Sequence, residues 1–432
     1  MASAVPTTSN SSKAVEWMWQ SNPNPWSKSE PAEWSRYCDV ENLIIEEAFS
    51  KKEQRAILDG YYIDFVDNIQ VSDTDSNKQR SVKRVLCKKE DKHLREARFM
   101  DLPVASDRSF GGEYGFVSPF VIEARRYLNL QPNELPSKQP DLIPMIVEKA
   151  AQGIIHEGQH IGEQRKAEKL ANLLRETKNK RMKEVWQCCA YLYSLESFLY
   201  KTLNATMRLV GSKEDERIWR SKVRNLGPFC LLLWDDPFNK KMKQNIKLYR
   251  GANLKPEQIA NYEEMAKKRH EYGSFQGFSS CSRNRKKAEA FGNALFIMKV
   301  KFAFIADLSK LSKYPGEEEE LVTPGVCFRV LNVEFDRKTD KHLISLELRQ
   351  RWADKREHIM HVDYTRNKPV DAYDFFLYTD ATKHLDYRAV DCDDDTLRER
   401  LHNRFRGFVL RANAANYDRD GMYEFRVNPD MF

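Results

Sequence analysis

A run of four glutamates at residues 317–320 is the stretch of the sequence with the clearest capacity for chemistry. Such a run is usually a solvated loop. This one passes directly into the apolar residues Leu321 and Val322, which predicts that Glu320 is held at the edge of a sheet. A carboxylate fixed in that way can stabilise a developing positive charge or accept a proton from a nucleophile. The run therefore indicates electrostatic or acid–base chemistry.

Two shorter signals precede this run. Arg250 ends a strand-like segment and is followed by Gly251. The planar fork of an arginine suits a phosphate group, and a glycine lets a ligand approach the backbone. Ser280 and Ser282 flank Cys281 at the end of a second strand-like segment, where their hydroxyls could position a ribose or a carboxylate. Each signal alone has an ordinary alternative, a surface arginine in the first case and helix capping in the second.

Taken in order, the three signals resemble the R-S-E signature of the arginine-specific ADP-ribosyltransferases, over residues 246–349. Arg250 matches the first-strand arginine of that family. Residues 280–282 match its Ser-Thr-Ser element with a cysteine in the middle, and residues 318–320 match its Glu-x-Glu turn. The Leu-Val-Thr-Pro sequence that follows fixes Glu320 as the catalytic position. The resemblance implies an α+β fold with a split two-sheet core and a helical subdomain before it.

The resemblance also implies roles. NAD, or the related NADP, would be the co-substrate, no metal would be needed, and the partners would be acceptor proteins with an exposed arginine. Glu320 would stabilise the oxocarbenium-like charge that forms as nicotinamide leaves. Glu318 would take a proton from the acceptor guanidinium, whose ordinary pKa lies above ~12. Arg250 would hold a phosphate, and Ser280 would orient Glu320. The implied catalytic residues are Arg250, Ser280, Glu318 and Glu320. The implied nucleotide-binding residues are Arg250, Gly251, Ser280, Ser282, Phe291 and Glu320.

Residues 14–90 are rich in tryptophan and tyrosine and end in a basic stretch. Aromatic rings stack on adenine and basic groups take phosphates, although aromatic residues also fill small cores. For Trp34 and Phe49 we expect the core. The order of Trp34, Glu46 and the β-prone pieces after them resembles a WWE domain. Some WWE domains grip the iso-ADP-ribose unit of poly-ADP-ribose and others do not. The ligand-binding residues implied by this resemblance are Trp19, Tyr61, Gln70 and Arg80.

A competing pattern lies further along the chain, where His156, Glu157 and His160 match the zinc-protease motif His-Glu-x-x-His. Histidines four residues apart share a helix face and can bind zinc. Gly158 weakens the helix, and a third ligand is missing, since Glu163 and Glu184 are candidates by default only. We expect these histidines to be solvated or packed rather than bound to zinc.

The composition bounds the class of protein. Of the 432 residues, 41% are hydrophobic and 31% charged, a mixture that builds globular cores and excludes wholesale disorder. The longest strongly apolar run, at 229–234, is far shorter than the ~20 residues of a membrane-spanning helix. The net charge of +7 favours anionic partners and leaves nucleic acid open. The cysteines lack zinc-knuckle spacing and no secretory signal is visible, so we expect reduced thiols and an intracellular site, cytoplasmic or nuclear.

Three functions therefore stay open. The first is transfer of ADP-ribose to arginine, guided by a WWE module that reads ADP-ribose polymer. The second is NAD hydrolysis by a toxin-like enzyme with water as the acceptor. The third is a protein that mainly binds poly-ADP-ribose. The intact pair Glu318 and Glu320 favours the first.

Hydrophobic periodicity predicts the elements that must position these residues. Helices are expected at 39–49, between 141 and 210, at 256–269 and at 284–291. Strands are expected at 61–66, 81–87, 246–250, 275–280, 294–304, 326–335 and 342–348. The expected organisation is a disordered tail at 1–13, a WWE domain at 14–90, a linker at 91–110, a helical subdomain at 111–245, a transferase core at 246–349 and a C-terminal extension of unknown role at 350–432.

Overall fold

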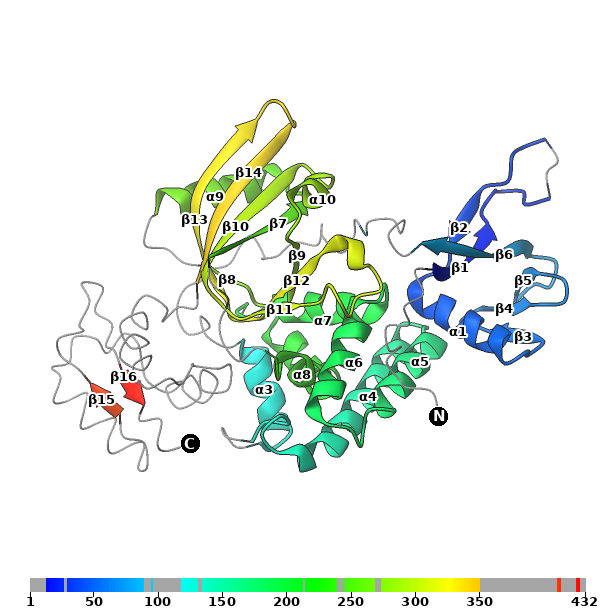
Figure 1. Cartoon of the computed structure of the whole chain (residues 1–432), viewed down its shortest axis with the longest axis horizontal. Coiled ribbons are helices and arrows are strands. Elements are labelled where there is room, and N and C mark those ends of the chain that lie inside the picture. Colours follow the sequence, from blue (N-terminus) through cyan, green and yellow to red (C-terminus); the bar gives the residue numbers. More distant parts are fainter. Residues whose placement is uncertain are drawn as a thin grey trace.

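The computed structural model describes residues 13–26, 29–88, 95, 118–130, 134–212, 214–238, 243, 245–268, 273–349, 410–412 and 425–427. These residues form an α+β structure with three main parts: a six-stranded sheet, a layer of helices and an eight-stranded sheet (Figure 1). The expected tail lies outside the described residues except for Lys13. The expected linker lies outside them except for Arg95. Of the expected C-terminal extension, only the short pair β15 (Leu410–Ala412) and β16 (Phe425–Val427) is described.

The N-terminal part is an antiparallel sheet in the order β2-β1-β6-β5-β4-β3 with one helix packed against it. The helix α1 (Asp39–Ser50) begins with a capping box, in which the Glu41 carboxylate accepts a hydrogen bond from the Cys38 backbone. Its apolar face buries Ile45 against Trp17, which is 2% exposed. The strands are β1 (Lys13–Gln20), β2 (Trp34–Arg36), β3 (Arg55–Ile57), β4 (Tyr61–Asp64), β5 (Ile69–Ser72) and β6 (Gln79–Lys88).

A layer of helices follows, as the periodicity between 141 and 210 predicts. The helices are α3 (Pro119–Tyr127), α4 (Ile143–His160), α5 (Gln164–Arg175), α6 (Met182–Ser194), α7 (Phe198–Arg208) and α8 (Glu216–Trp234). The backbone of α4 approaches α8 closely at Gly153, where a Cβ would collide with the carbonyl of Asn225. The helical core continues into the sheet above it through residues such as Ala306 and Leu321. The helices therefore support the strands that carry the acidic run.

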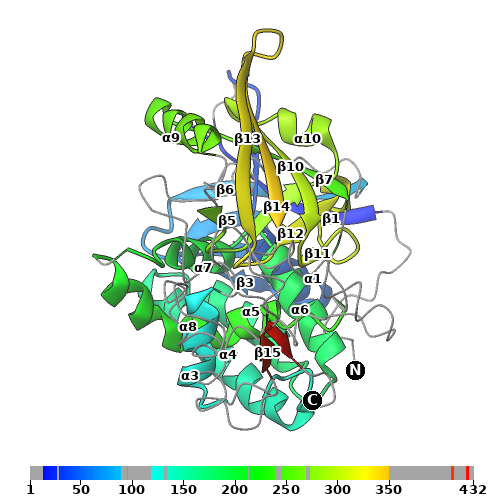
Figure 2. The same cartoon turned by 90° about the vertical axis from the view of Figure 1, so that its left-hand side faces the viewer.

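The third part is a mixed eight-stranded sheet in the order β11-β12-β9-β7-β10-β14-β13-β8. Its two halves are joined between β7 and β9 by a single register pair, Tyr249 with Ser282. The strands β11 and β12 accordingly diverge from β13 and β14, as Figures 1 and 2 show. The strands are β7 (Ile246–Ala252), β8 (Gly273–Ser274), β9 (Ser279–Ser282), β10 (Ala294–Phe302), β11 (Ile305–Asp307), β12 (Glu319–Val322), β13 (Cys327–Asp336) and β14 (Lys341–Arg349). The strand expected at 275–280 corresponds to β9, which begins later, at Ser279.

Two helices flank this sheet, α9 (Pro256–Lys267) and α10 (Arg285–Glu289). The N-terminal part lies beside α5, with its helix α1 facing α5 (Figure 1). Its Asp59 carboxylate accepts hydrogen bonds from the backbone N–H groups of Arg165 and Lys166 at the start of α5, which satisfies donors that a helix start leaves free. Within the described ranges, no helix is both long and apolar enough to cross a membrane.

Candidate active site

Three neighbouring strands bring the arginine, the serine cluster and the acidic run together. Arg250 lies on β7, Ser280 on β9 and Glu320 on β12, and these strands are adjacent in the sheet in the order β12-β9-β7. In the antiparallel pair β12–β9, Glu320 lies opposite Cys281 and Leu321 opposite Ser280. Segments far apart in the sequence thus meet at one place in the sheet.

The guanidinium of Arg250 is fixed inside the sheet. The side chain is 3% exposed, and Nη1 donates a 2.6 Å hydrogen bond to the carbonyl oxygen of Ser280. The next residue, Gly251, allows α10 to cross β7 closely. A Cβ there would collide with the carbonyl oxygen of Ala288 and lie 2.9 Å from the Cβ of Phe291. Phe291 is itself buried, so its ring packs at this crossing.

The hydroxyl of Ser282 ties the end of β9 to the acidic turn. Its Oγ donates a 2.7 Å hydrogen bond to the carbonyl oxygen of Glu317 and accepts one from the backbone N–H of Asn284. Ser280 is buried and uses its carbonyl for Arg250. Cys281 lies between these two serines. Burial raises the pKa of its thiol to about 12, so this thiol stays protonated and unreactive at neutral pH.

Glu318 is the exposed carboxylate of the turn. Its backbone has a φ of 51°, in the left-handed region, and its side chain is 42% exposed. Asn284 Nδ2 and Lys287 Nζ each lie 3.2 Å from its Oε1. Burial alone would raise the pKa of this carboxyl, but these two hydrogen bonds and the charges of Lys287 and Arg283 outweigh burial and hold the pKa below its usual value. Glu318 is therefore a charged group that faces solvent.

Glu320 is the buried carboxylate, at 1% exposure. Lys243 Nζ lies 2.6 Å from its Oε2, and Arg283 Nε lies 3.4 Å from its Oε1. Burial raises the pKa of Glu320, and the nearby Lys243 offsets only part of that effect. Two carboxylates separated by one residue thus have environments that move their pKa values in opposite directions.

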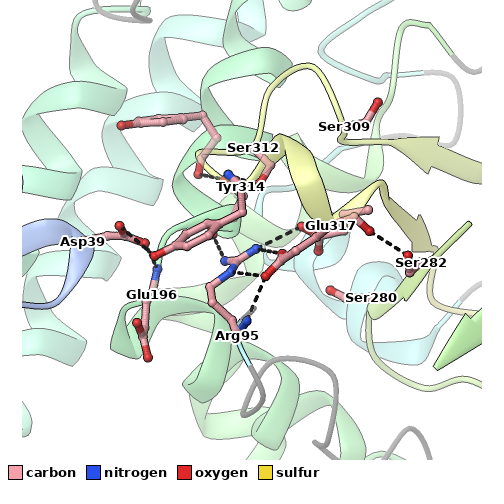
Figure 3. Close-up of polar contacts among 12 residues, drawn as sticks. Asp39, Arg95, Glu196, Ser280, Ser282, Ser309, Ser312, Tyr314 and Glu317 are labelled. Carbon is pink, nitrogen blue, oxygen red and sulfur yellow. Dashed lines mark hydrogen bonds and ion pairs between the residues drawn. The ribbon is translucent and has the colours of Figure 1, made fainter. Parts of the chain in front are cut away.

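The other two glutamates of the run make different contacts. Glu317 and Glu319 are both buried and both bond to the guanidinium of Arg95. In Figure 3 the Arg95 side chain reaches Glu317 and lies beside the ring of Tyr314. The acidic run therefore divides into two residues held by Arg95 and two that contact Lys243 and Lys287.

The aromatic and basic residues expected to bind ADP-ribose lie on four neighbouring strands of the N-terminal sheet, β1, β6, β5 and β4. Arg80 lies over the ring of Trp19 at 5.2 Å and opposite Gln70 in the β5–β6 register. Gln70 Oε1 accepts a 2.7 Å hydrogen bond from Tyr37, whose ring lies 6.3 Å from that of Tyr61. The four expected residues are thus connected around Tyr37, a residue that the sequence reasoning did not include in the site.

Family models match two parts of the chain, the WWE domain over residues 15–84 and NAD:arginine ADP-ribosyltransferase over residues 163–354. The chain contains a WWE domain followed by an NAD:arginine ADP-ribosyltransferase domain. Both resemblances read from the motifs are therefore confirmed, as is the α+β fold class.

Similar solved structures include three bacterial proteins. ADP-ribosyltransferase HopU1 of Pseudomonas syringae pv. Tomato is 16% identical, with a TM-score of 0.34, over 49% of this chain and 98% of that chain. The type III effector XopAI from Xanthomonas axonopodis pv. citri is 13% identical, with a TM-score of 0.34, over 53% of this chain and 96% of that chain. C3stau2 from S. aureus is 18% identical, with a TM-score of 0.28, over 38% of this chain and 87% of that chain. Among curated protein sequences, none matches the chain.

The zinc-protease pattern lies on α4 and has a structural role. Glu157 is 1% exposed and bonds to Lys222 Nζ at 2.6 Å and Asn225 Nδ2 at 2.7 Å, both on α8. His156 and His160 are exposed to solvent. Within the described ranges, no three histidine, cysteine or acidic side chains gather in a way that could hold a metal ion. Glu157 joins two helices of the layer below the transferase sheet.

The expectation that Trp34 and Phe49 fill the core of the WWE domain is wrong for Phe49 and only half right for Trp34. Phe49 is 43% exposed, because it lies near the end of α1 on the domain surface. Trp34 is half-buried and stacks under Lys83, whose Nζ lies 3.9 Å from the ring centre. The core tryptophan is Trp17, whose indole N–H donates a 2.9 Å hydrogen bond to Glu46.

Four cations around the acidic turn of the transferase domain are not among the residues predicted from the sequence. Lys243 and Arg283 contact Glu320, Lys287 contacts Glu318, and Arg95 contacts the two other glutamates. Arg283 and Lys287 follow the serine cluster directly, so their closeness to the site was a usable signal. Lys243 and Arg95 carried none, because no motif includes them.

Proposed function

We propose that this protein transfers ADP-ribose from NAD to the guanidinium of an arginine in an acceptor protein. The observation that carries the proposal is the contrast between Glu320 and Glu318. The first is buried with a raised pKa, and the second is half-exposed with a lowered one. Pairs of titratable groups with such opposed environments are typical of sites that divide a reaction between two roles.

Transfer breaks the bond between C1 of the nicotinamide ribose and the ring nitrogen, and the electron pair leaves with nicotinamide. Glu320, buried beside the serine cluster, stabilises the positive charge that develops on the ribose. A guanidinium nitrogen of the acceptor then bonds to that carbon, and its proton passes to Glu318. The exposure of Glu318 supports this assignment, because a large acceptor must reach it.

The remaining site residues bind the dinucleotide in this proposal. Arg250 takes a phosphate, Gly251 offers its backbone to the nicotinamide amide, and Phe291 lines the nicotinamide side. Ser280 and Ser282 orient the ribose and the acidic turn. The hydrogen bond from Ser282 to the Glu317 carbonyl supports the second of these roles.

The test is incubation of the whole protein with labelled NAD and agmatine, a small guanidine acceptor, beside a control without acceptor. We expect ADP-ribosyl-agmatine as the main product. Label that appears only as free ADP-ribose would favour the NAD glycohydrolase alternative. No turnover in either sample would reject the enzymatic function and favour a protein that mainly binds ADP-ribose polymers.

We further propose that the WWE domain binds the iso-ADP-ribose unit of poly-ADP-ribose. The support is the group of Trp19, Gln70, Tyr61 and Arg80 around Tyr37, which combines rings for stacking with a guanidinium for phosphate. Calorimetry with iso-ADP-ribose should give saturable heat that Arg80→Ala removes. Arg55→Ala is the matched control, because Arg55 lies on β3 and pairs with Asp64 at an exposed site. Absence of heat with the wild type would reject polymer reading.

A further inference from the structure

A single residue from between the two matched domains reaches into the base of the acidic turn. Arg95 lies outside both family matches, which cover residues 15–84 and 163–354. It is 4% exposed. Its backbone N–H and its Nε donate hydrogen bonds of 3.0 and 3.1 Å to Glu317 Oε1, and Nη2 bonds to Glu317 Oε2. Nη2 also lies 3.5 Å from Glu319, and Nη1 donates to the carbonyl of Ser194 at the end of α6.

The charge balance of this cluster makes Arg95 hard to replace. Burial opposes the positive charge of Arg95, but the carboxylates of Glu317 and Glu319 outweigh it and keep the pKa of the guanidinium above its ordinary value. The side chains of Arg95, Glu317 and Glu319 are each at most 2% exposed. Removing one partner of such a cluster leaves a buried charge without its counter-charge, which is strongly destabilising locally.

The same cluster is connected to the WWE domain. The ring of Tyr314 lies 3.9 Å from the guanidinium carbon of Arg95, and its hydroxyl donates a 3.1 Å hydrogen bond to Asp39. Asp39 is the first residue of α1, and it also accepts from the backbone N–H of Glu196 and pairs with Lys313. Figure 3 shows this chain of contacts from Asp39 through Tyr314 to Arg95 and Glu317. The acidic turn is therefore anchored to both the helical layer and the WWE domain.

The backbone of the turn explains why such an anchor is needed. Glu318 has a left-handed φ of 51°, which a residue other than glycine keeps only when its surroundings hold it. Its two neighbours are the residues that Arg95 holds. Glu318 is thereby directed away from Arg95 toward Asn284 and Lys287.

We propose that Arg95 is a positioning residue for the catalytic turn. By holding Glu317 and Glu319, Arg95 fixes the positions of Glu318 and Glu320. The proposal rests on the proposed transferase function for its catalytic readout. Arg95 forms a bidentate fork that a lysine cannot reproduce. Loss of the fork frees the turn that carries Glu318, while Glu320 is also held by the pairing of β12 with β9. Transfer to arginine should therefore suffer more than NAD hydrolysis.

The experiment compares Arg95→Met, Arg95→Lys and the wild type in the full-length protein. The ratio of agmatine transfer to NAD hydrolysis should fall at least tenfold in Arg95→Met and by an intermediate factor in Arg95→Lys, which keeps the charge. Hydrogen–deuterium exchange should increase in peptides that cover residues 314–322. Arg175→Met is the matched control, because it removes an arginine–glutamate pair with Glu148 away from the turn, and both readouts should stay at wild-type values.

The two readouts separate failure of this inference from failure of the proposed function. If the wild type does not modify agmatine, the proposed function is rejected, and the exchange data alone decide whether Arg95 holds the turn. If Arg95→Met unfolds, Arg95→Lys decides. A variant that keeps both the wild-type product ratio and wild-type exchange at 314–322 would overturn the inference.

Discussion

Replacing the two carboxylates of the acidic turn one at a time should divide the reaction into its two halves. Glu320→Gln removes the charge from a side chain that is 1% exposed and keeps its shape. Loss of one buried, preorganised electrostatic group costs ~3 kcal/mol, or ~10²-fold in kcat. Because Glu320 is assigned to the charge that forms as nicotinamide leaves, both transfer and NAD hydrolysis should fall by about that factor.

Glu318→Gln should behave differently. A general base contributes about 10²–10⁴-fold to a reaction, and we expect the low end because the side chain is 42% exposed and solvent screens it. Transfer to agmatine should therefore fall about 10²-fold. NAD hydrolysis should stay close to the wild-type rate, because water as the acceptor brings no guanidinium proton for Glu318 to accept.

Both variants and the wild type are assayed with labelled NAD, with and without agmatine, and ADP-ribosyl-agmatine is separated from free ADP-ribose. The control is Glu334→Gln, which changes an exposed glutamate on β13 and should leave both rates unchanged. Normal turnover by Glu320→Gln would refute the assignment of the catalytic position. Equal loss of both activities in both variants would refute the division of roles.

Two further predictions test the surroundings of the site. In the proposed reaction Glu320 acts as an anion, so activity should be lost as the pH falls through its raised pKa. Lys243→Met removes the ammonium that lowers this pKa, so the acidic limb of kcat/KM for NAD hydrolysis should move to higher pH, whereas Lys243→Arg should leave it in place. Gly251→Ala adds a Cβ that collides with the backbone of α10, which should lower the free energy of unfolding by about 1–3 kcal/mol. Chemical denaturation measures this, and Gly277→Ala, whose Cβ would meet nothing nearer than 3.4 Å, should cost little by comparison.

The single elements around the site could be predicted because their signals are local. The apolar spacing at 39–49 and the strand signal at 294–304 correspond to α1 (Asp39–Ser50) and β10 (Ala294–Phe302). The order of strands could not be predicted in this way. The adjacency of β12, β9 and β7 depends on pairing between distant segments, so only the family resemblance indicated that Arg250 and Glu320 belong to one site.

The cations that surround the site are a second feature that the sequence alone could not predict. The chain has 71 lysines and arginines, and nothing local distinguishes Lys243 from the others. Its contact with Glu320 spans 77 residues of sequence, and the backbone of Lys243 is held near β11 by its bridge to Ala303. The burial of Arg95 likewise has no signal in the sequence, since a charged residue in a polar stretch is ordinarily exposed.

The acidic run at 317–320 combines a local sequence signal with contacts that come from distant segments. Four consecutive carboxylates repel one another, and burial of several in one place would be unfavourable. In the structure each of these carboxylates contacts a cation. Glu317 and Glu319 contact Arg95, whereas Glu318 contacts Lys287 and Glu320 contacts Lys243. A shift of one residue in β12 would exchange the faces of Glu319 and Glu320, because side chains alternate along a strand. In the proposed reaction, Glu317 and Glu319 matter as much as the two catalytic glutamates, since their attachment to Arg95 leaves Glu318 and Glu320 for the chemistry.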